Sequence, residues 1–282
     1  MTSAVTLPTM TTPVRSPGCA GVISLLILLD SAGAPVALTR LGAVITLAET
    51  EPVTTGSREE TPMTPIAPRL YVDSADVDRV SRLLAAGVVY GVTTNPTILE
   101  RGGRTAAEIP DLYARWVEEG AREVFFQTWG GDTASFLRNA EGIRALGDRV
   151  AVKVPATPDG FAAASALVRD GATVLVTAVY SVAQALAGAA IGARYLAPYL
   201  GRMRDAGVDG EVVIARMQEM CAGTDSNVLA ASLRSAEDLV GLRRAGVPYF
   251  TAAPDVLDQV LSNPVSDASA AEFDAAMVRL GA

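Results

Sequence analysis

The feature of this sequence that most constrains its fold is a regular alternation of two kinds of segment, which begins at Arg69. Short runs rich in Val, Leu, Tyr and Phe, a composition typical of strands, alternate with Ala-rich stretches of helical spacing, such as 75–86, 133–146 and 181–190. The expected strands are 70–73, 88–93, 123–127, 150–154, 172–177, 193–197, 228–232 and 247–251. Helix-start residues precede several helical stretches, namely Ser74, Asp132, Ser181 and Ser235.

The number and character of these segments predict the fold class. Strands that are apolar on both faces are typical of a parallel sheet covered by helices. Eight strand–helix repeats favour a closed (β/α)₈ TIM barrel over an open doubly wound sheet. The motif G-x-G-x-x-G does not follow the first strand, which further disfavours a dinucleotide-binding fold. We therefore predict an α/β barrel domain at 67–282.

Residues 1–66 differ from the rest, because they are rich in Thr, Pro and Ser and lack a clear amphipathic period. We predict an N-terminal extension that is disordered or lies upstream of a true start at Met63. The apolar run 21–29 is too short for a bilayer, which needs ~20 residues, so no membrane association is expected. It resembles the apolar part of a signal peptide, but it starts late and only Arg15 precedes it.

Composition excludes several function classes. The chain has no histidine, which removes Ser-His-Asp, Cys-His and most zinc chemistry. Its net charge of -8 offers no basic field for nucleic acid, although a few arginines suffice for a small phosphorylated metabolite. Cys19 and Cys221 have no metal-ligand spacing and fit a reducing cytoplasm, where we expect the protein.

Polar residues sit at nearly every strand end, which is where barrels of this type place their chemistry. We take as candidate site residues Asp73, Thr93, Asn95, Gln127, Lys153, Thr177, Tyr199, Arg202, Ser232 and Arg234.

Lys153 is the sharpest candidate, because it is the chain's single lysine and lies within an apolar strand. Burial lowers the pKa of an ammonium and makes the neutral amine accessible. A neutral amine attacks a ketone to give an iminium ion, which accepts electrons during carbon–carbon cleavage. The alternative is a structural lysine paired with Asp73 or another carboxylate.

The neighbouring candidates have complementary roles. Tyr199 suits proton transfer, with water held by Gln127 and Thr177, and Asp73 and Asn95 suit hydrogen bonds to sugar hydroxyls. Asp73-Ser74 is also a helix N-cap, and Asn95-Pro96 is also a turn.

Phosphate recognition has separate candidates. Ser232 and Arg234 close the seventh strand, and Arg202 offers a second guanidinium, although both arginines also fit ordinary surface charge.

With these residues assembled, the chain resembles the transaldolase family, in its short fructose-6-phosphate aldolase-like branch. The resemblance runs from about Arg69 to the C-terminus and leaves the N-terminal extension unmatched. The matching segments are 70–76 (LYVDSAD), 91–97 (GVTTNPT), 152–157 (VKVPAT), 176–181 (VTAVYS), 195–202 (YLAPYLGR) and 228–234 (VLAASLR).

The resemblance implies a role for each site residue. Lys153 would be the Schiff-base lysine, and Asp73, Thr93 and Asn95 would surround the substrate hydroxyls. The phosphate would be held by Arg202, Ser232 and Arg234. It also implies a class I aldolase with no metal and no organic cofactor. Homo-oligomeric rings of barrels are implied too, with the amphipathic tail 271–279 docking on a neighbour.

The branch of the family that the chain resembles affects which reaction is expected. True transaldolases of the family carry glutamate at the end of the third strand and typically Ser-Pro-Phe at the sixth, whereas this chain has Gln127 and Ala197-Pro198-Tyr199. The resemblance therefore favours an aldolase that releases free dihydroxyacetone. The alternative is a transaldolase that holds the three-carbon enamine for a second aldehyde, with a role in a specialised sugar pathway also open.

Two further readings remain. The segment 91–96 and the place of Lys153 on the fourth strand argue against deoxyribose-phosphate and dihydrodipicolinate types of lysine barrel. A non-catalytic barrel that binds sugar phosphates would keep ligand binding when Lys153 is replaced by Arg. The acceptor aldehyde stays open among glyceraldehyde 3-phosphate, erythrose 4-phosphate and a pentose phosphate.

Overall fold

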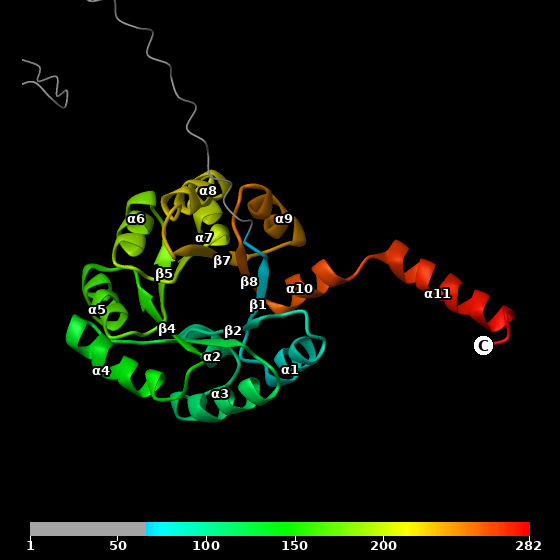
Figure 1. Ribbon diagram of the computed structural model, residues 1–282, viewed down its shortest axis with the longest axis horizontal. Coiled ribbons are helices and arrows are strands. Elements are labelled where there is room, and N and C mark those ends of the chain that lie inside the picture. The colour runs from blue at the N-terminus through cyan, green and yellow to red at the C-terminus, as the bar shows by residue number, and fades with distance from the viewer. Residues whose placement is uncertain (1–65) are drawn as a thin grey trace, which may run out of the picture. The chain divides into compact units, whose positions relative to one another are not determined.

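The eight expected strands form one closed parallel barrel in the order β1 to β8, which confirms the predicted (β/α)₈ fold (Figure 1). The computed structural model describes residues 66–282, so the predictions for residues 1–65, including the apolar run 21–29, lie outside the described part. The strands are β1 Arg69–Asp73, β2 Gly91–Thr93, β3 Glu123–Gln127, β4 Val150–Pro155, β5 Val174–Val179, β6 Tyr195–Pro198, β7 Asn227–Leu233 and β8 Tyr249–Ala252.

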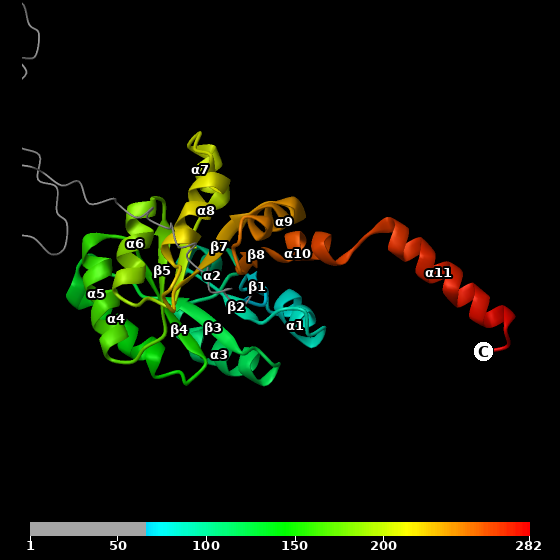
Figure 2. The same cartoon turned by 45° about the horizontal axis from the view of Figure 1, so that its top comes forward.

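Helices follow the strands, and all except the last, α11, lie around the barrel (Figures 1 and 2). They are α1 Val77–Ala85, α2 Pro96–Arg101, α3 Ile109–Glu118, α4 Thr133–Arg144, α5 Pro158–Arg169, α6 Val182–Ala190, α7 Leu200–Asp205, α8 Gly210–Met220, α9 Ala236–Arg244, α10 Pro254–Leu261 and α11 Pro264–Arg279, with a 3₁₀ turn η1 Ala106–Glu108. Within residues 66–282, no helix has the length and apolar character needed to cross a membrane.

Three of the four expected helix starts are N-caps. Asp132, Ser181 and Ser235 each accept a hydrogen bond from the backbone N–H three residues on, as a cap requires. The expectation that Ser74 starts a helix was wrong, because Asp76 caps α1 and Ser74 instead accepts from the Asp76 backbone N–H. Asp73 is therefore not used as a cap and stays available to the barrel interior.

Strand alternation divides the barrel into an interior and an exterior layer. Residues two apart along a strand share a face, so Glu123, Phe125 and Gln127 project inward, while Val124 and Phe126 belong to the core between sheet and helices. The interior core consists of Tyr71, Phe125, Ala151, Leu175, Tyr195, Ala197, Leu229 and Tyr249. These side chains fill the middle of the barrel and leave the next inward position on each strand for the site.

The last helix, α11, stands apart from this packing. It has no buried residue. The apolar side chains of Phe273 and Met277, and of the C-cap residue Leu280, are all more than half exposed. Their spacing of four and three residues puts them on one face of the helix. Figures 1 and 2 show α11 running away from the barrel beyond α10.

Candidate active site

Lys153 lies inside the barrel at the carboxyl end of β4, one inward position beyond Ala151. The parallel register pairs it with Gln127 on β3 and with Leu175 on β5. Only 4% of the residue is exposed. The inward direction follows from the strand period of two, because Val152 and Val154 on either side pack outward against the helices.

The amine of Lys153 is buried without a bound partner. Within residues 66–282 its Nζ forms no ion pair or hydrogen bond, so Lys153 and Asp73 are not joined by a salt bridge. Burial lowers the pKa of Lys153 below its ordinary value, and the charge of the Asp73 carboxylate opposes that shift. This environment favours a neutral amine more than solvent does.

Asp73 ends β1 beside Lys153 and begins a short chain of hydrogen bonds. Its Oδ1 accepts from the Thr93 hydroxyl at 2.6 Å, and the Thr93 and Thr251 hydroxyls are also 2.6 Å apart. Burial raises the pKa of Asp73, whereas the charge on Lys153 and the Thr93 hydrogen bond lower it. Thr93 is fully buried and lies beneath Asp73, so it positions this carboxyl group rather than facing the cavity.

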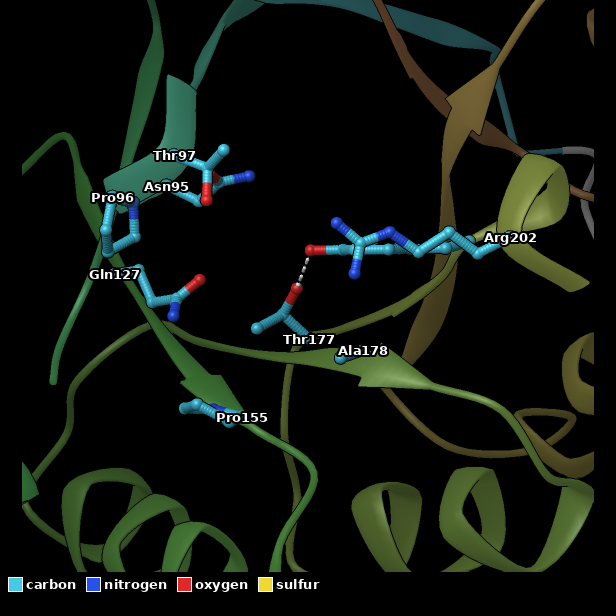
Figure 3. A pocket seen from close by; sticks show the side chains of 9 residues that line it. Asn95, Pro96, Thr97, Gln127, Pro155, Thr177, Ala178 and Arg202 are labelled. Atoms are coloured by element: carbon cyan, nitrogen blue, oxygen red, sulfur yellow. Dashed lines mark hydrogen bonds between the residues drawn. The ribbon is translucent and has the colours of Figure 1, made fainter. Parts of the chain in front are cut away.

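Tyr199 and Thr177 form a second polar pair on the other side of the barrel. Their hydroxyl oxygens lie 2.8 Å apart, drawn as the dashed line in Figure 3. Burial raises the pKa of Tyr199, so the phenol keeps its proton and can donate it. Tyr199 follows β6, bridges to Ala231 on β7 and precedes α7, which fixes its backbone between two strand ends.

Two residues beside this pair adopt left-handed backbone conformations that side chains disfavour. Ala178 has φ 59° and Ser232 has φ 56°. Each sits at a register shift in the sheet, between Thr177 and Val179 on β5 and between Ala230 and Leu233 on β7. Such strain costs ~1–3 kcal/mol per residue and concentrates at functional sites. The two bulges flank Tyr199 and redirect the strand ends around it.

These groups line two adjoining cavities at the carboxyl ends of the strands. One of about 260 Å³ is lined by Asn95, Pro96, Thr97, Gln127, Pro155, Thr177, Ala178, Tyr199 and Arg202 (Figure 3). A second, of about 180 Å³, is lined by Asp73, Asn95, Thr97, Ile98, Arg101, Lys153, Tyr199, Arg202, Ala231 and Ser232. Because Asn95, Thr97, Tyr199 and Arg202 line both, the cavities are adjacent parts of one site.

Asn95 is both a helix cap and a cavity residue. Its Oδ1 accepts from the Ile98 backbone N–H at 3.0 Å and begins α2, while its side chain lies at the cavity edge beside Thr97 (Figure 3). The turn at Asn95-Pro96 and the cavity role are therefore compatible. Gln127 projects toward the same space from β3.

The arginines occupy different positions. Arg202 extends into the cavity from the side opposite Asn95 (Figure 3), with its guanidinium carbon 5.1 Å from the centre of the Tyr199 ring. Arg234 lines neither cavity, because its two terminal nitrogens donate to Asp205 at 2.8 and 2.6 Å. Its Nε still lies close to Gly201, where a Cβ would be only 2.7 Å from it and 2.9 Å from Ser232 Oγ.

Eight of the ten sequence-derived candidates therefore line the cavities, and Thr93 and Arg234 stand just behind them. Sequence reasoning missed Thr251, Thr97, Arg101, Pro155 and Ala178. Thr251 could have been predicted from the sequence, because it ends the expected eighth strand two residues after the inward Tyr249. Arg101 carried no local signal, since it looks like an ordinary basic residue in the last turn of a helix.

Among residues 66–282 there is no cluster of three or more His, Cys, Asp or Glu side chains that could hold a metal ion. Within that span the cavities are lined by one amine, one carboxyl group, the Thr177–Tyr199 hydroxyl pair and two guanidinium groups. Such a set suits attack by the amine on a carbonyl group, followed by proton transfers.

Comparison with known proteins gives a consistent match over the barrel. The family model described as Transaldolase/Fructose-6-phosphate aldolase matches residues 70–281. A probable transaldolase of Chelativorans sp. is 32% identical over 215 residues, which covers 76% of this chain and 98% of that protein. One of Paracoccus denitrificans has the same identity and coverage. One of Methanococcus maripaludis is 30% identical over 207 residues, covering 73% and 95%.

Proposed function

The chain belongs to the transaldolase and fructose-6-phosphate aldolase family and is an enzyme of it, and we propose that it is a class I, Schiff-base aldolase. The substrate we propose is a phosphorylated sugar from which a dihydroxyacetone unit is removed, or to which it is added. The observation that carries the proposal is Lys153, a single lysine buried at an inward strand end with its pKa lowered and its Nζ in no recorded bond within residues 66–282.

The proposed first stage forms the iminium ion. Neutral Nζ of Lys153 attacks the ketone carbon of the sugar phosphate and gives a carbinolamine, which loses water. That water needs a proton, and the Tyr199 phenol, 2.8 Å from Thr177, is placed to supply it. Asp73 lies beside Lys153, and its charge stabilises the cationic iminium nitrogen that results.

The second stage breaks the carbon–carbon bond. A base removes the proton from the hydroxyl next to the breaking bond, the aldehyde departs, and the electron pair moves into the iminium to leave an enamine. Asp73, whose pKa burial raises, is our candidate for that base. The proton taken up by Asp73 then passes through Tyr199 or a water held by Gln127 and Thr177 to the enamine carbon. Hydrolysis of the resulting iminium frees dihydroxyacetone and Lys153 and returns the proton that Tyr199 gave in the first stage.

Borohydride trapping tests this proposal directly. The protein is incubated with dihydroxyacetone or fructose 6-phosphate, reduced, and analysed by intact and peptide mass spectrometry. We expect a three-carbon adduct on Lys153, with the N-terminal amine as the single competing amine in the chain. The Lys153→Arg variant is the matched control. If folded protein binds ligand but forms no adduct, the non-catalytic sugar-phosphate barrel is the better description.

Obligatory transfer of the three-carbon unit is the second candidate, and it differs only in the fate of the enamine. The neutral Gln127 and the phenol of Tyr199 favour aldol cleavage, because the phenol can protonate the enamine before an acceptor arrives. Release of free dihydroxyacetone without added aldehyde supports the aldolase. Turnover that requires an acceptor such as erythrose 4-phosphate supports the transaldolase.

We also propose that the protein is a homo-oligomer in which α11 docks on a neighbouring barrel. The support is the face made by Phe273, Met277 and Leu280, each of which is more than half exposed. Sedimentation should show a larger assembly for the full chain than for a chain ending after Ser262. The cytoplasmic location inferred from the cysteines stays a prediction.

A further inference from the structure

Two arginines line the cavity that contains Lys153. Arg101, at the end of α2, lines the 180 Å³ cavity together with Thr97 and Ile98 of the same helix. Arg202 lines it from α7, and in Figure 3 its guanidinium enters from the side opposite Thr97. The cavity thus has a cation on the α2 wall and another on the α7 wall, with Ser232 also in its lining.

Both guanidinium groups are available to a ligand. Within residues 66–282 neither Arg101 nor Arg202 is recorded in an ion pair or a side-chain hydrogen bond, although Arg202 lies over the Tyr199 ring. Arg234 differs, because its terminal nitrogens are both engaged by Asp205. Asp73 is the single carboxylate in the lining of this cavity and stands beside Lys153. The outer part of the cavity is therefore positively charged.

We propose that Arg101 is a second phosphate-binding residue, which holds the phosphate of the acceptor aldehyde from the side opposite Arg202. The inference rests on the proposed function and names a specificity residue for the same site. A guanidinium presents a planar fork of N–H donors that matches phosphate oxygens in pairs. Two such groups on different walls of the cavity, with Ser232 also in the lining, can bind an anionic end group and leave the carbonyl end free to approach Lys153.

A purely structural role for Arg101 makes a different prediction. In the last turn of α2 a cation also complements the helix dipole, for which any positive charge serves. Lysine keeps that charge but lacks the fork. Arg101→Lys therefore separates the two roles, and Arg101→Gln removes both.

The test measures aldol addition of dihydroxyacetone to glyceraldehyde 3-phosphate and to unphosphorylated glyceraldehyde, using the full chain. We expect Arg101→Gln to raise KM for the phosphorylated acceptor at least ~10-fold and to change kinetics with glyceraldehyde less than ~2-fold, the size of effect expected when a phosphate contact is lost. Arg101→Lys should recover only part of the loss. Arg216→Gln on α8, also exposed, is the charge-matched control and should resemble the parent.

Equal effects on both acceptors, or none on either, overturn the inference, as does full recovery with lysine. A measurement without turnover separates it from the proposed function. Calorimetric titration with inorganic phosphate should show weaker binding in Arg101→Gln than in the parent. If no Lys153 adduct forms yet this weakening is seen, the aldolase proposal fails and Arg101 keeps its role. If the adduct forms and phosphate binding is unchanged, the aldolase proposal stands and the proposed role of Arg101 is wrong.

Discussion

The two ends of the barrel are made by the same eight strands, but they differ in how completely their polar groups are hydrogen-bonded. At the amino end, the Glu123 carboxylate accepts from the Tyr71 hydroxyl at 2.7 Å and from the Tyr195 hydroxyl at 2.7 and 2.8 Å. Arg69 covers the same end, 4.1 Å from the Tyr90 ring centre and 5.2 Å from that of Tyr249. Every one of these groups has a partner within the barrel.

At the carboxyl end, fewer of the polar groups have such partners. The Nζ of Lys153 has no recorded partner in residues 66–282, Asp73 is bound by one hydroxyl, and two residues hold left-handed backbone. Strand β3 shows the contrast over a single face, with a hydrogen-bonded Glu123 at one end and Gln127 facing the cavity at the other. We therefore expect the amino end to contribute to the stability of the fold and the carboxyl end to bind the substrate.

The substitution with the largest expected effect on this contrast is Lys153→Met, which removes the amine and keeps an unbranched apolar side chain. We expect turnover to fall by ~10⁴-fold or more, because no other amine lies in the site. The fold should persist, since within residues 66–282 the Lys153 side chain forms no hydrogen bond or ion pair and the substitution keeps the backbone bonds of β4. Steady-state kinetics and circular dichroism measure the two. Residual activity within ~100-fold of the parent would contradict the assignment of Lys153 as nucleophile.

Tyr199→Phe removes one hydroxyl from the carboxyl end and should lower turnover by ~10²–10⁴-fold, the usual contribution of a positioned proton donor. The borohydride adduct should still form, but more slowly, because dehydration of the carbinolamine uses the same proton and water can supply it over a longer incubation. Measuring the cleavage rate and the final adduct yield on the same sample checks this. A final adduct yield that falls as far as the cleavage rate would mean that Tyr199 shapes the cavity and does not transfer a proton.

Asp73→Asn changes the pH dependence as well as the rate. The Asp73 charge raises the pKa of Lys153 against the effect of burial, so its removal lowers that pKa further. Because the neutral amine is the proposed nucleophile, the acid limb of kcat/KM against pH should move to lower pH. We expect the rate at the plateau to fall by ~10–100-fold, since a candidate base is lost. An acid limb that moves to higher pH would contradict the electrostatic coupling of the two groups.

At the amino end, Glu123→Gln should affect stability instead of chemistry. The neutral amide replaces a charged acceptor for two tyrosine hydroxyls, so the free energy of unfolding should fall by ~1–3 kcal/mol. Urea denaturation measures the change, with the exposed Glu141→Gln on α4 as control. A large loss of turnover with unchanged stability would show that the two ends are not divided as described.

The sequence was enough to predict the barrel and the polar residues at its carboxyl end, but not the hydrogen-bonded cluster at its amino end. Apolar runs at eight places specify parallel strands, and the period of two then places Asp73, Gln127, Lys153 and Thr177 inward at the same end. Burial of Lys153 followed from its apolar neighbours alone. These inferences succeed because they depend on local pattern and on one topological rule.

What the sequence did not reveal depends on tertiary contacts. The ion pair of Arg234 with Asp205 joins β7 to the end of α7, and nothing local to either residue indicates it. The left-handed backbone at Ala178 and Ser232 is equally hidden, because such positions normally carry Gly or Asn. The predicted cap of α1 was wrong for a simpler reason, because Ser74 and Asp76 are both residues that cap helices well and they lie two positions apart.

The smallest effect we predict comes from Ala178→Gly. Glycine adopts φ 59° without the steric cost that alanine bears, so the free energy of unfolding should rise by ~1 kcal/mol despite the extra freedom of the unfolded chain. Ala187→Gly, at an exposed position inside α6, should lower it by a similar ~1 kcal/mol. If both substitutions destabilise, Ala178 is not strained, and the carboxyl end holds no stored energy at this bulge. Opposite signs would mean that the protein gives up stability there to orient Thr177 toward Tyr199.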